Sequence, residues 1–121
     1  AKAMKLIMPH LEGKLHGQSV RVPTPNVSMV DLNVTVGKKT SAQEVNEVLR
    51  QKADSSLSGI IAMDDDMKVS QDLQGDANSS IVASDLTQVV AEDMVKIMAW
   101  YDNEWGYSNR LVDMAVYVGK K

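Results

Sequence analysis

The chain has 121 residues, about the size of one domain, so we expect a single hydrophobic core. Its formal charge of −3 and pI near 5.3 give no basic surface for nucleic acid, and no apolar stretch approaches the roughly 18 residues that span a bilayer. The absence of cysteine excludes a disulfide framework, a thiolate metal site and a thiol nucleophile within this chain. We therefore expect a protein of the cytoplasm or of a plastid stroma that binds neither nucleic acid nor a membrane.

The first elements in chain order are a helix and two strands. Residues 1–8 are predicted to form a helix that Pro9 ends, because the residue before a proline avoids helical backbone. No capping residue precedes this helix, which suggests a boundary inside an element. After a turn at Gly13, residues 19–23 and 27–36 are predicted as strands. Alternation in the second strand predicts a sheet with one wet face, with Val30, Leu32, Val34 and Val36 apolar and Asp31, Asn33 and Thr35 polar.

Two helices are predicted further along the chain. Ser41 and Glu44 have the spacing of a capping box, in which each side chain accepts a hydrogen bond from the backbone N–H of the other residue. The apolar face of this helix is predicted to consist of Val45, Val48, Leu49 and Ala53. The second helix is predicted from Asn103 to a stop at Gly119, with its apolar residues at Leu111, Val112, Ala115 and Val118.

Short strands are predicted between these helices, separated by polar turns. They span residues 59–63, 69–73, 80–84, 87–90 and 94–101. Runs of strands with few helices favour an α+β fold, with a mostly antiparallel sheet and helices on one face. A doubly wound fold is disfavoured, because the glycine-rich phosphate turn is absent and the strands lie too close together for helical crossovers.

Most polar residues lack the spacing of a catalytic or metal site. His10 and His16 are expected on the surface, because no nearby residue completes a metal ligand set or a nucleophile–base pair. The acidic run at 64–66 lacks the spaced ligands of a calcium loop and is interpreted as a solvated loop.

Arg21 lies in a stiff segment, which makes it a candidate anion-binding residue. Pro23 and Pro25 restrict the backbone beside it, and hydroxyl and amide side chains follow. Such rigidity suits an arginine that binds an oxyanion through two parallel hydrogen bonds. The alternative is a structural ion pair between Arg21 and a carboxylate.

A second candidate segment, residues 100–108, joins the last strand to the last helix. It carries four large aromatic side chains and two carboxylates. Asp102 or Asn103 is predicted to cap the helix, as such residues do at helix starts. The functional alternative is that the side chains of this junction point into a cleft, where the amide of Asn103 can pair with another amide.

These two candidate segments carry a family resemblance. They read RVPTPNVSMVDL at 21–32 and WYDNEWGYSNRLVD at 100–113, and they resemble phosphorylating glyceraldehyde-3-phosphate dehydrogenase. The similarity extends through KLHGQSVRVPTPNVS, KKTSAQEVNEVLR, LSGII and MVKIMAWYDNEWGYS, so it covers essentially the whole chain in order, with variants typical of the cyanobacterial and plastid branch. It implies that residues 1–121 are the C-terminal part of the catalytic domain, without the N-terminal Rossmann cofactor domain.

The resemblance also implies a chemistry. Members of that family oxidise and phosphorylate an aldehyde in glycolysis or carbon fixation, with NAD or NADP: a cysteine forms a thiohemiacetal, hydride passes to the cofactor, and phosphate releases the thioester. By position, Arg21 is implied to bind phosphate or the phosphorylated aldehyde, and Asn103 to hold the nicotinamide carboxamide. Tyr101 and Tyr107 are implied to lie near the reacting centre.

The family's catalytic cysteine, catalytic histidine and cofactor domain have no counterpart in this sequence, and neither His10 nor His16 matches that histidine. We therefore expect the chain alone to be inactive and to bind no cofactor. Its expected partner is the missing N-terminal part of the dehydrogenase or a second copy of itself. The alternative is a stand-alone natural or engineered module that keeps the fold and works through binding or assembly.

Overall fold

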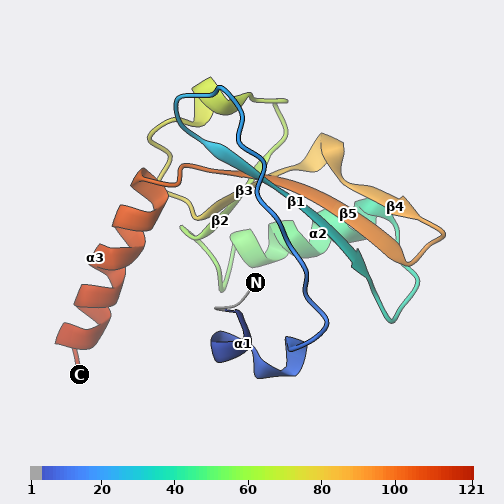
Figure 1. The fold of residues 1–121 in the computed structure, drawn as a ribbon, viewed down its shortest axis with the longest axis horizontal. Coiled ribbons are helices and arrows are strands. Elements are labelled where there is room, and N and C mark those ends of the chain that lie inside the picture. The colour runs from blue at the N-terminus through green and yellow to red at the C-terminus, as the bar shows by residue number, and fades with distance from the viewer. Residues whose placement is uncertain (1–3) are drawn as a thin grey trace.

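The computed structural model describes residues 4–121, which form one sheet with helices beside it (Figure 1). The first three residues of the predicted N-terminal helix lie outside the described residues. In chain order the helices and strands are α1 (Met4–Ile7), β1 (Ser28–Thr35), α2 (Ala42–Ala53), β2 (Ile61–Asp64), β3 (Ser80–Ala83), β4 (Gln88–Val90), β5 (Met94–Tyr101) and α3 (Trp105–Gly119). Short 3₁₀ helices are η1 (Pro9–Leu11), η2 (Ser70–Leu73) and η3 (Ser84–Leu86).

The sheet is organised around β5. Its strand order is β1-β5-β3-β2, and β4 also pairs with β5. The three pairings of β5, with β1, β3 and β4, are antiparallel, whereas β2 and β3 are parallel. The segment that contains η2 makes the connection between the two parallel strands. The predicted α+β fold with a mostly antiparallel sheet is therefore confirmed.

Both faces of the sheet carry core residues. Ile81 lies opposite Trp100 and Val82 opposite Ala99, so neighbouring residues of β3 and β5 point to opposite faces. One buried cluster consists of Val27, Leu73 and Ile81, with Ala62 and Trp100 packed against it. The other face, on which α2 lies, buries Val82, Val95 and Ala99. The sheet is thus covered by the η2 segment on one side and by α2 on the other.

The strand predicted at residues 19–23 is wrong. This segment is exposed irregular chain, and no described strand pairs with it. Without a neighbour, the N–H and C=O groups of an extended segment have no ladder to join. Pro23 also has no N–H to donate.

The strand predicted at residues 69–73 is also wrong, because these residues enter η2. The carboxylate of Asp72 accepts a hydrogen bond from the backbone N–H of Val69 at 2.9 Å. Such a local bond competes with strand pairing. The turn still carries Leu73 into the core, where its side chain is buried.

The remaining predicted elements are confirmed, with limits that differ by at most two residues for the five strands. The capping box forms: the N–H of Glu44 donates to Oγ of Ser41 at 3.2 Å, and the N–H of Ser41 donates to Oε2 of Glu44 at 3.0 Å. The C-terminal helix begins at Trp105 and ends at Gly119, and it projects away from the sheet (Figure 1). Within residues 4–121, no helix has the length and apolarity that crossing a bilayer requires.

Candidate functional site

The junction between β5 and α3 is built on a buried carboxylate. The side chain of Asp102 is 2% exposed. Its Oδ1 accepts hydrogen bonds from the backbone N–H groups of Glu104 and Trp105, both at 2.9 Å, so of the two predicted caps it is Asp102, not Asn103, that satisfies the start of the helix. Its Oδ2 accepts from the N–H of Gly75 at 2.8 Å and from Nδ2 of Asn26 at 3.1 Å.

These four donors decide the charge of Asp102. Burial alone would raise the pKa of its carboxyl, but the hydrogen bonds from three backbone N–H groups and from Asn26 outweigh burial and lower the pKa. The carboxylate therefore ties together the segment after Arg21, the loop at Gly75 and the start of α3. The close fit extends to Gly106, where a Cβ atom would lie 2.9 Å from the carbonyl oxygen of Asn78.

Asn103 is exposed beside this carboxylate, and its amide is oriented from the neighbouring strand. The hydroxyl of Ser28, the first residue of β1, donates to Oδ1 of Asn103 at 3.3 Å. Ser28 reaches it because it pairs with Tyr101 at the end of β5. Among the described residues, the Nδ2 group of Asn103 has no partner, so two donors remain available.

Arg21 is exposed, and its guanidinium forms no ion pair with any described residue. The alternative of a structural pair with a carboxylate is therefore not observed within residues 4–121. Tyr101 is half-buried next to Asn103, and Tyr107 lies exposed on the first turn of α3. Tyr101 and Asn103 thus both lie at the junction, and within residues 4–121 no hydrogen bond links either of them to Arg21.

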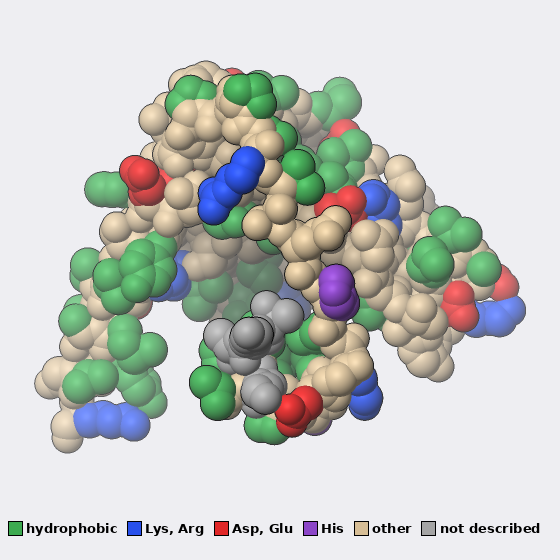
Figure 2. Space-filling model, viewed as in Figure 1, with side chains coloured by type: hydrophobic (Ala, Val, Ile, Leu, Met, Phe, Trp, Pro, Cys, Tyr) green, Lys and Arg blue, Asp and Glu red, His purple; other side chains and the backbone are tan. Residues whose placement is uncertain are grey.

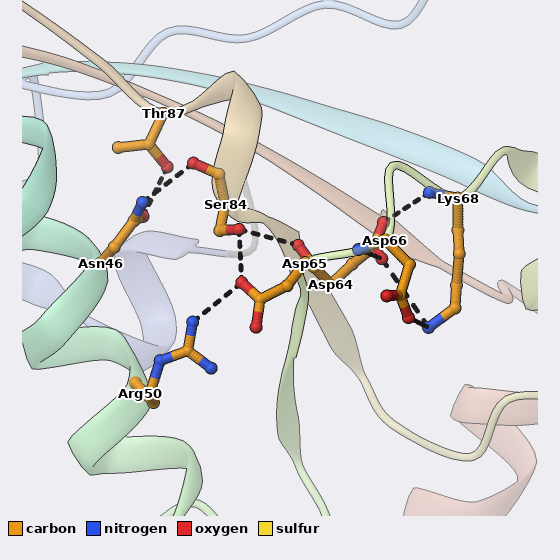
Figure 3. Close-up of polar contacts among 8 residues, drawn as sticks. All are labelled: Asn46, Arg50, Asp64, Asp65, Asp66, Lys68, Ser84 and Thr87. Atoms are coloured by element: carbon orange, nitrogen blue, oxygen red, sulfur yellow. Dashed lines mark hydrogen bonds and ion pairs between the residues drawn. The ribbon is translucent and has the colours of Figure 1, made fainter.

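A second polar network, which the sequence did not predict, holds α2 to the sheet (Figure 3). Nη2 of Arg50 lies 2.8 Å from Oδ1 of Asp65, which also accepts from the hydroxyl of Ser84 at 2.6 Å. These two hydrogen bonds lower the pKa of Asp65 to about 2. On the same helix, Asn46 donates to the carbonyl oxygen of Ser84 at 2.9 Å and accepts from the hydroxyl of Thr87 at 2.7 Å.

The acidic run at 64–66 is only partly the solvated loop that was predicted. Asp64 is fully buried and accepts hydrogen bonds from the backbone N–H groups of Asp66 and Lys68, at 3.0 and 2.9 Å. Its role is to fix the loop after β2, as Figure 3 shows. Across residues 4–121, no group of histidine and acidic side chains could hold a metal ion. His10 and His16 are exposed, as predicted.

An open hollow lies away from these candidate residues, between α2 and the sheet. It is an open groove of about 950 Å³. Apolar side chains from both elements line it, and charged residues of α2 and of the preceding loop form its rim. The lining includes Val34, Val45, Val48, Val95 and Ile97.

Comparison with known proteins identifies the family of this chain. The model of the C-terminal domain of glyceraldehyde 3-phosphate dehydrogenase matches residues 1–103. The chain belongs to the glyceraldehyde-3-phosphate dehydrogenase family. It is 52% identical over 121 residues to glyceraldehyde-3-phosphate dehydrogenase 2 of Nostoc sp., covering 100% of this chain and 36% of that protein. With the corresponding Synechocystis sp. protein it shares 54% identity over 120 residues, covering 99% of this chain and 36% of that protein.

A chloroplastic glyceraldehyde-3-phosphate dehydrogenase of Arabidopsis thaliana is 54% identical over 115 residues, which are 95% of this chain and 29% of that protein. Relatives thus include cyanobacterial and chloroplastic dehydrogenases, as the resemblance implied. The chain spans about a third of the length of these curated relatives. The relatives also align over α3, whereas the family model ends at Asn103, two residues before that helix begins.

Proposed function

We propose that this chain is the C-terminal part of the catalytic domain of a phosphorylating glyceraldehyde-3-phosphate dehydrogenase, and that it supplies binding groups while a preceding part supplies the nucleophile. The observation that carries the proposal is the alignment of the whole chain, at about 52% identity, with only 36% of the Nostoc enzyme. The absence of cysteine agrees with this division, because the chain has no thiol to attack an aldehyde.

Arg21 is the proposed phosphate-binding residue. Its guanidinium is exposed and forms no ion pair within residues 4–121, so its donors are available to an anion. An arginine binds phosphate through two parallel, charge-assisted hydrogen bonds. Asn26, five residues further along this segment, is fixed by Asp102, which ties the segment to the β5–α3 junction.

Asn103 is the proposed contact for the nicotinamide of NAD or NADP, which accepts hydride when bound. A carboxamide offers one acceptor oxygen and two N–H donors, and the side chain of Asn103 has the same complementary set. Because Ser28 donates to its Oδ1, the Nδ2 group of Asn103 is oriented away from β1 and is free to donate to the carboxamide oxygen. Tyr101 and Tyr107 are proposed to lie beside the reacting centre.

A preceding part of the polypeptide would also complete the core. The buried indole Nε1 of Trp100, at the end of β5 beside the candidate residues, has no hydrogen-bond partner among the described residues. Buried polar groups in folded proteins are nearly always paired. We infer that the partner of this N–H lies outside the described residues, in a preceding part of the polypeptide. In the cell, the assembled enzyme is proposed to reside in the cytoplasm or a plastid stroma.

The second candidate function is a binding or assembly module without dehydrogenase chemistry. The observation that favours it is the apolar surface of α3, which Figure 2 shows as green side chains at the lower left. Its exposed members are Leu111, Val112, Met114, Val116, Tyr117 and Val118. A helix that is apolar around most of its surface is usually buried against other elements.

A fusion protein distinguishes the two functions. Residues 1–121 are joined to the part of the Nostoc enzyme that precedes the aligned region, and aldehyde-dependent reduction of NAD and NADP is measured in the presence of phosphate. We expect activity in the fusion and none in the isolated chain. A fusion that melts cooperatively but has no activity would contradict the dehydrogenase proposal and favour the binding module.

The variant Asn103→Ala tests the cofactor contact in the same fusion. Losing a hydrogen bond that a bound ligand needs costs about 1 to 3 kcal/mol, so we expect the KM for the cofactor to rise about tenfold with the melting temperature unchanged. Asn33→Ala is the matched control, because Asn33 is an exposed asparagine on β1 with only the carboxylate of Asp31 as its partner. Equal effects of the two substitutions would exclude a specific role for Asn103.

A further inference from the structure

Val27 has a backbone conformation that valine rarely adopts. Its φ angle is 66°, in the left-handed region that is strongly disfavoured for a β-branched residue. Its side chain is only 7% exposed and belongs to the buried cluster beneath η2. The other non-glycine residues with positive φ within residues 4–121 are all exposed: Met67, Ala91 and Glu92. A strained residue persists only where its surroundings hold it in place, and such residues gather at functional sites.

The residues on either side of Val27 contact two successive residues of the β5–α3 junction. Nδ2 of Asn26 donates to Oδ2 of Asp102 at 3.1 Å. The hydroxyl of Ser28 donates to Oδ1 of Asn103 at 3.3 Å. Val27 therefore links the contact that satisfies the buried carboxylate to the contact that orients the amide.

We propose that Val27 is a positioning residue for the cofactor contact: its left-handed backbone holds the hydroxyl of Ser28 against the amide of Asn103. A change of φ to the common negative values would be a rotation of about 120° or more around one bond. This rotation would turn the chain before Val27 relative to the chain after it. The contacts of Asn26 and Ser28 with the junction would then not both survive. The proposal rests on the role proposed for Asn103 in binding the nicotinamide.

The side chain of Val27 supplies the packing that holds its backbone in place. It packs in the cluster with Leu73 and Ile81, against which Trp100 also lies. Relaxation of the backbone would withdraw this side chain from the core and return apolar surface to water, which opposes the relaxation. A glycine would adopt the same φ without strain but would contribute no packing. Valine thus couples the core of the sheet to the orientation of the Asn103 amide.

Replacement of Val27 by alanine and by glycine separates positioning from packing. Alanine loses most of the packing but keeps the penalty for a positive φ, so the backbone should relax, whereas glycine has no such penalty and should keep the turn. In the fusion enzyme, we expect Val27→Ala to raise the KM for the cofactor by about three- to tenfold, the upper limit being complete loss of the Asn103 contact. Val27→Gly should leave this KM within about twofold of its original value, although glycine loses more of the side chain.

Two further variants serve as controls. Val95 is 2% exposed on the other face of the sheet, so Val95→Ala should lower the melting temperature without changing the KM for the cofactor. Val27→Ala combined with Asn103→Ala should raise the KM no further than Asn103→Ala alone, because both substitutions remove the same contact. A role in packing alone predicts a different order, in which glycine is at least as harmful as alanine.

Nuclear Overhauser effects in the isotope-labelled 121-residue chain test the positioning without enzyme activity. Cross-peaks between the side chains of Ser28 and Asn103 should appear in the unmodified chain and in Val27→Gly, and should be lost in Val27→Ala. Equal KM values for the alanine and glycine variants, or cross-peaks that persist in Val27→Ala, would overturn the proposal. An inactive fusion would contradict the dehydrogenase proposal alone, and the cross-peaks would still decide the role of Val27.

Discussion

The β5–α3 junction and the outer edge of β1 belong to the same sheet, but they differ in how their groups are satisfied. At the junction, both oxygens of the buried Asp102 carboxylate are fully hydrogen-bonded by four donors. At the edge, Val30, Leu32 and Val34 are exposed, and no strand within residues 4–121 pairs with the outer backbone groups. The Asp102 carboxylate thus finds all its donors within this chain, whereas the outer side of β1 has no partner among the described residues.

The difference separates polar groups whose partners lie within this chain from groups that have no partner among the described residues. Asn103 is oriented by Ser28 of β1, which belongs to this chain, so the geometry of its amide is expected to survive in the isolated chain. The apolar residues of β1 and α3 are exposed, and the buried indole N–H of Trp100 has no partner among the described residues. Three measurements follow, in order of decreasing effect.

The largest effect is expected from Asp102→Ala. It removes the carboxylate that accepts from the N–H of Gly75 and from the first N–H groups of α3, and a hydrogen bond to a charged group contributes about 1.5 to 3 kcal/mol. We expect the free energy of unfolding in urea to fall by about 3 kcal/mol. Glu104 is an exposed neighbour whose side chain makes no capping hydrogen bond, so Glu104→Ala should change the free energy of unfolding by less than about 0.5 kcal/mol. A small loss for Asp102→Ala would show that the junction is not complete within the chain.

An intermediate effect is expected from acid. The folded pKa of Asp65 is depressed to about 2 from 3.8, so its contribution to stability is present above the unfolded pKa and is lost as the pH falls from about 4 to about 2. The pKa of Asp102 is lowered as well, which adds a loss of the same sign. Unfolding measured against pH should therefore show a steeper decline in this window for the unmodified chain than for Asp65→Asn. Identical slopes would mean that the Arg50–Asp65 pair does not form in solution.

The smallest effect on stability is expected from Arg21→Ala, because Arg21 is exposed and forms no ion pair with the described residues. The free energy of unfolding should change by less than about 0.5 kcal/mol. Phosphate should bind the isolated chain in the millimolar range or more weakly, since one exposed ion pair contributes about 1 kcal/mol or less. Isothermal titration with phosphate checks this, and tight binding would mean that the site is already complete.

The sequence predicted what local chemistry determines and missed what depends on distant contacts. The capping box of Ser41 and Glu44 and the cap by Asp102 follow from spacing, because both bonds reach within three residues along the chain. The burial of Asp64 and the pairing of Arg50 with Asp65 depend on how the loop after β2 meets α2 and η3, which no local pattern contains. The strand prediction at residues 69–73 was wrong because the apolar pattern there is too short to determine a strand. The hydrogen bond from the backbone N–H of Val69 to the carboxylate of Asp72 favours the 3₁₀ turn instead.

The candidate site was also predictable only where local sequence determines it. Spacing and aromatic content identified the segment around Asn103, and stiffness identified that of Arg21. Neither pattern indicated that Ser28 would orient the amide of Asn103, since this contact requires β1 to pair with β5. The bond from Asn26 to Asp102, which joins the two segments, likewise depends on the tertiary fold.

The dependence of the fusion enzyme on phosphate tests the central claim most directly. A charge-assisted hydrogen bond contributes about 1.5 to 3 kcal/mol, so Arg21→Ala should raise the KM for phosphate about 10- to 100-fold with the melting temperature unchanged. Arg21→Lys should recover only part of this loss, because lysine cannot form two parallel hydrogen bonds. An unchanged KM for phosphate together with a lowered melting temperature would show that Arg21 has a structural role and would contradict the account.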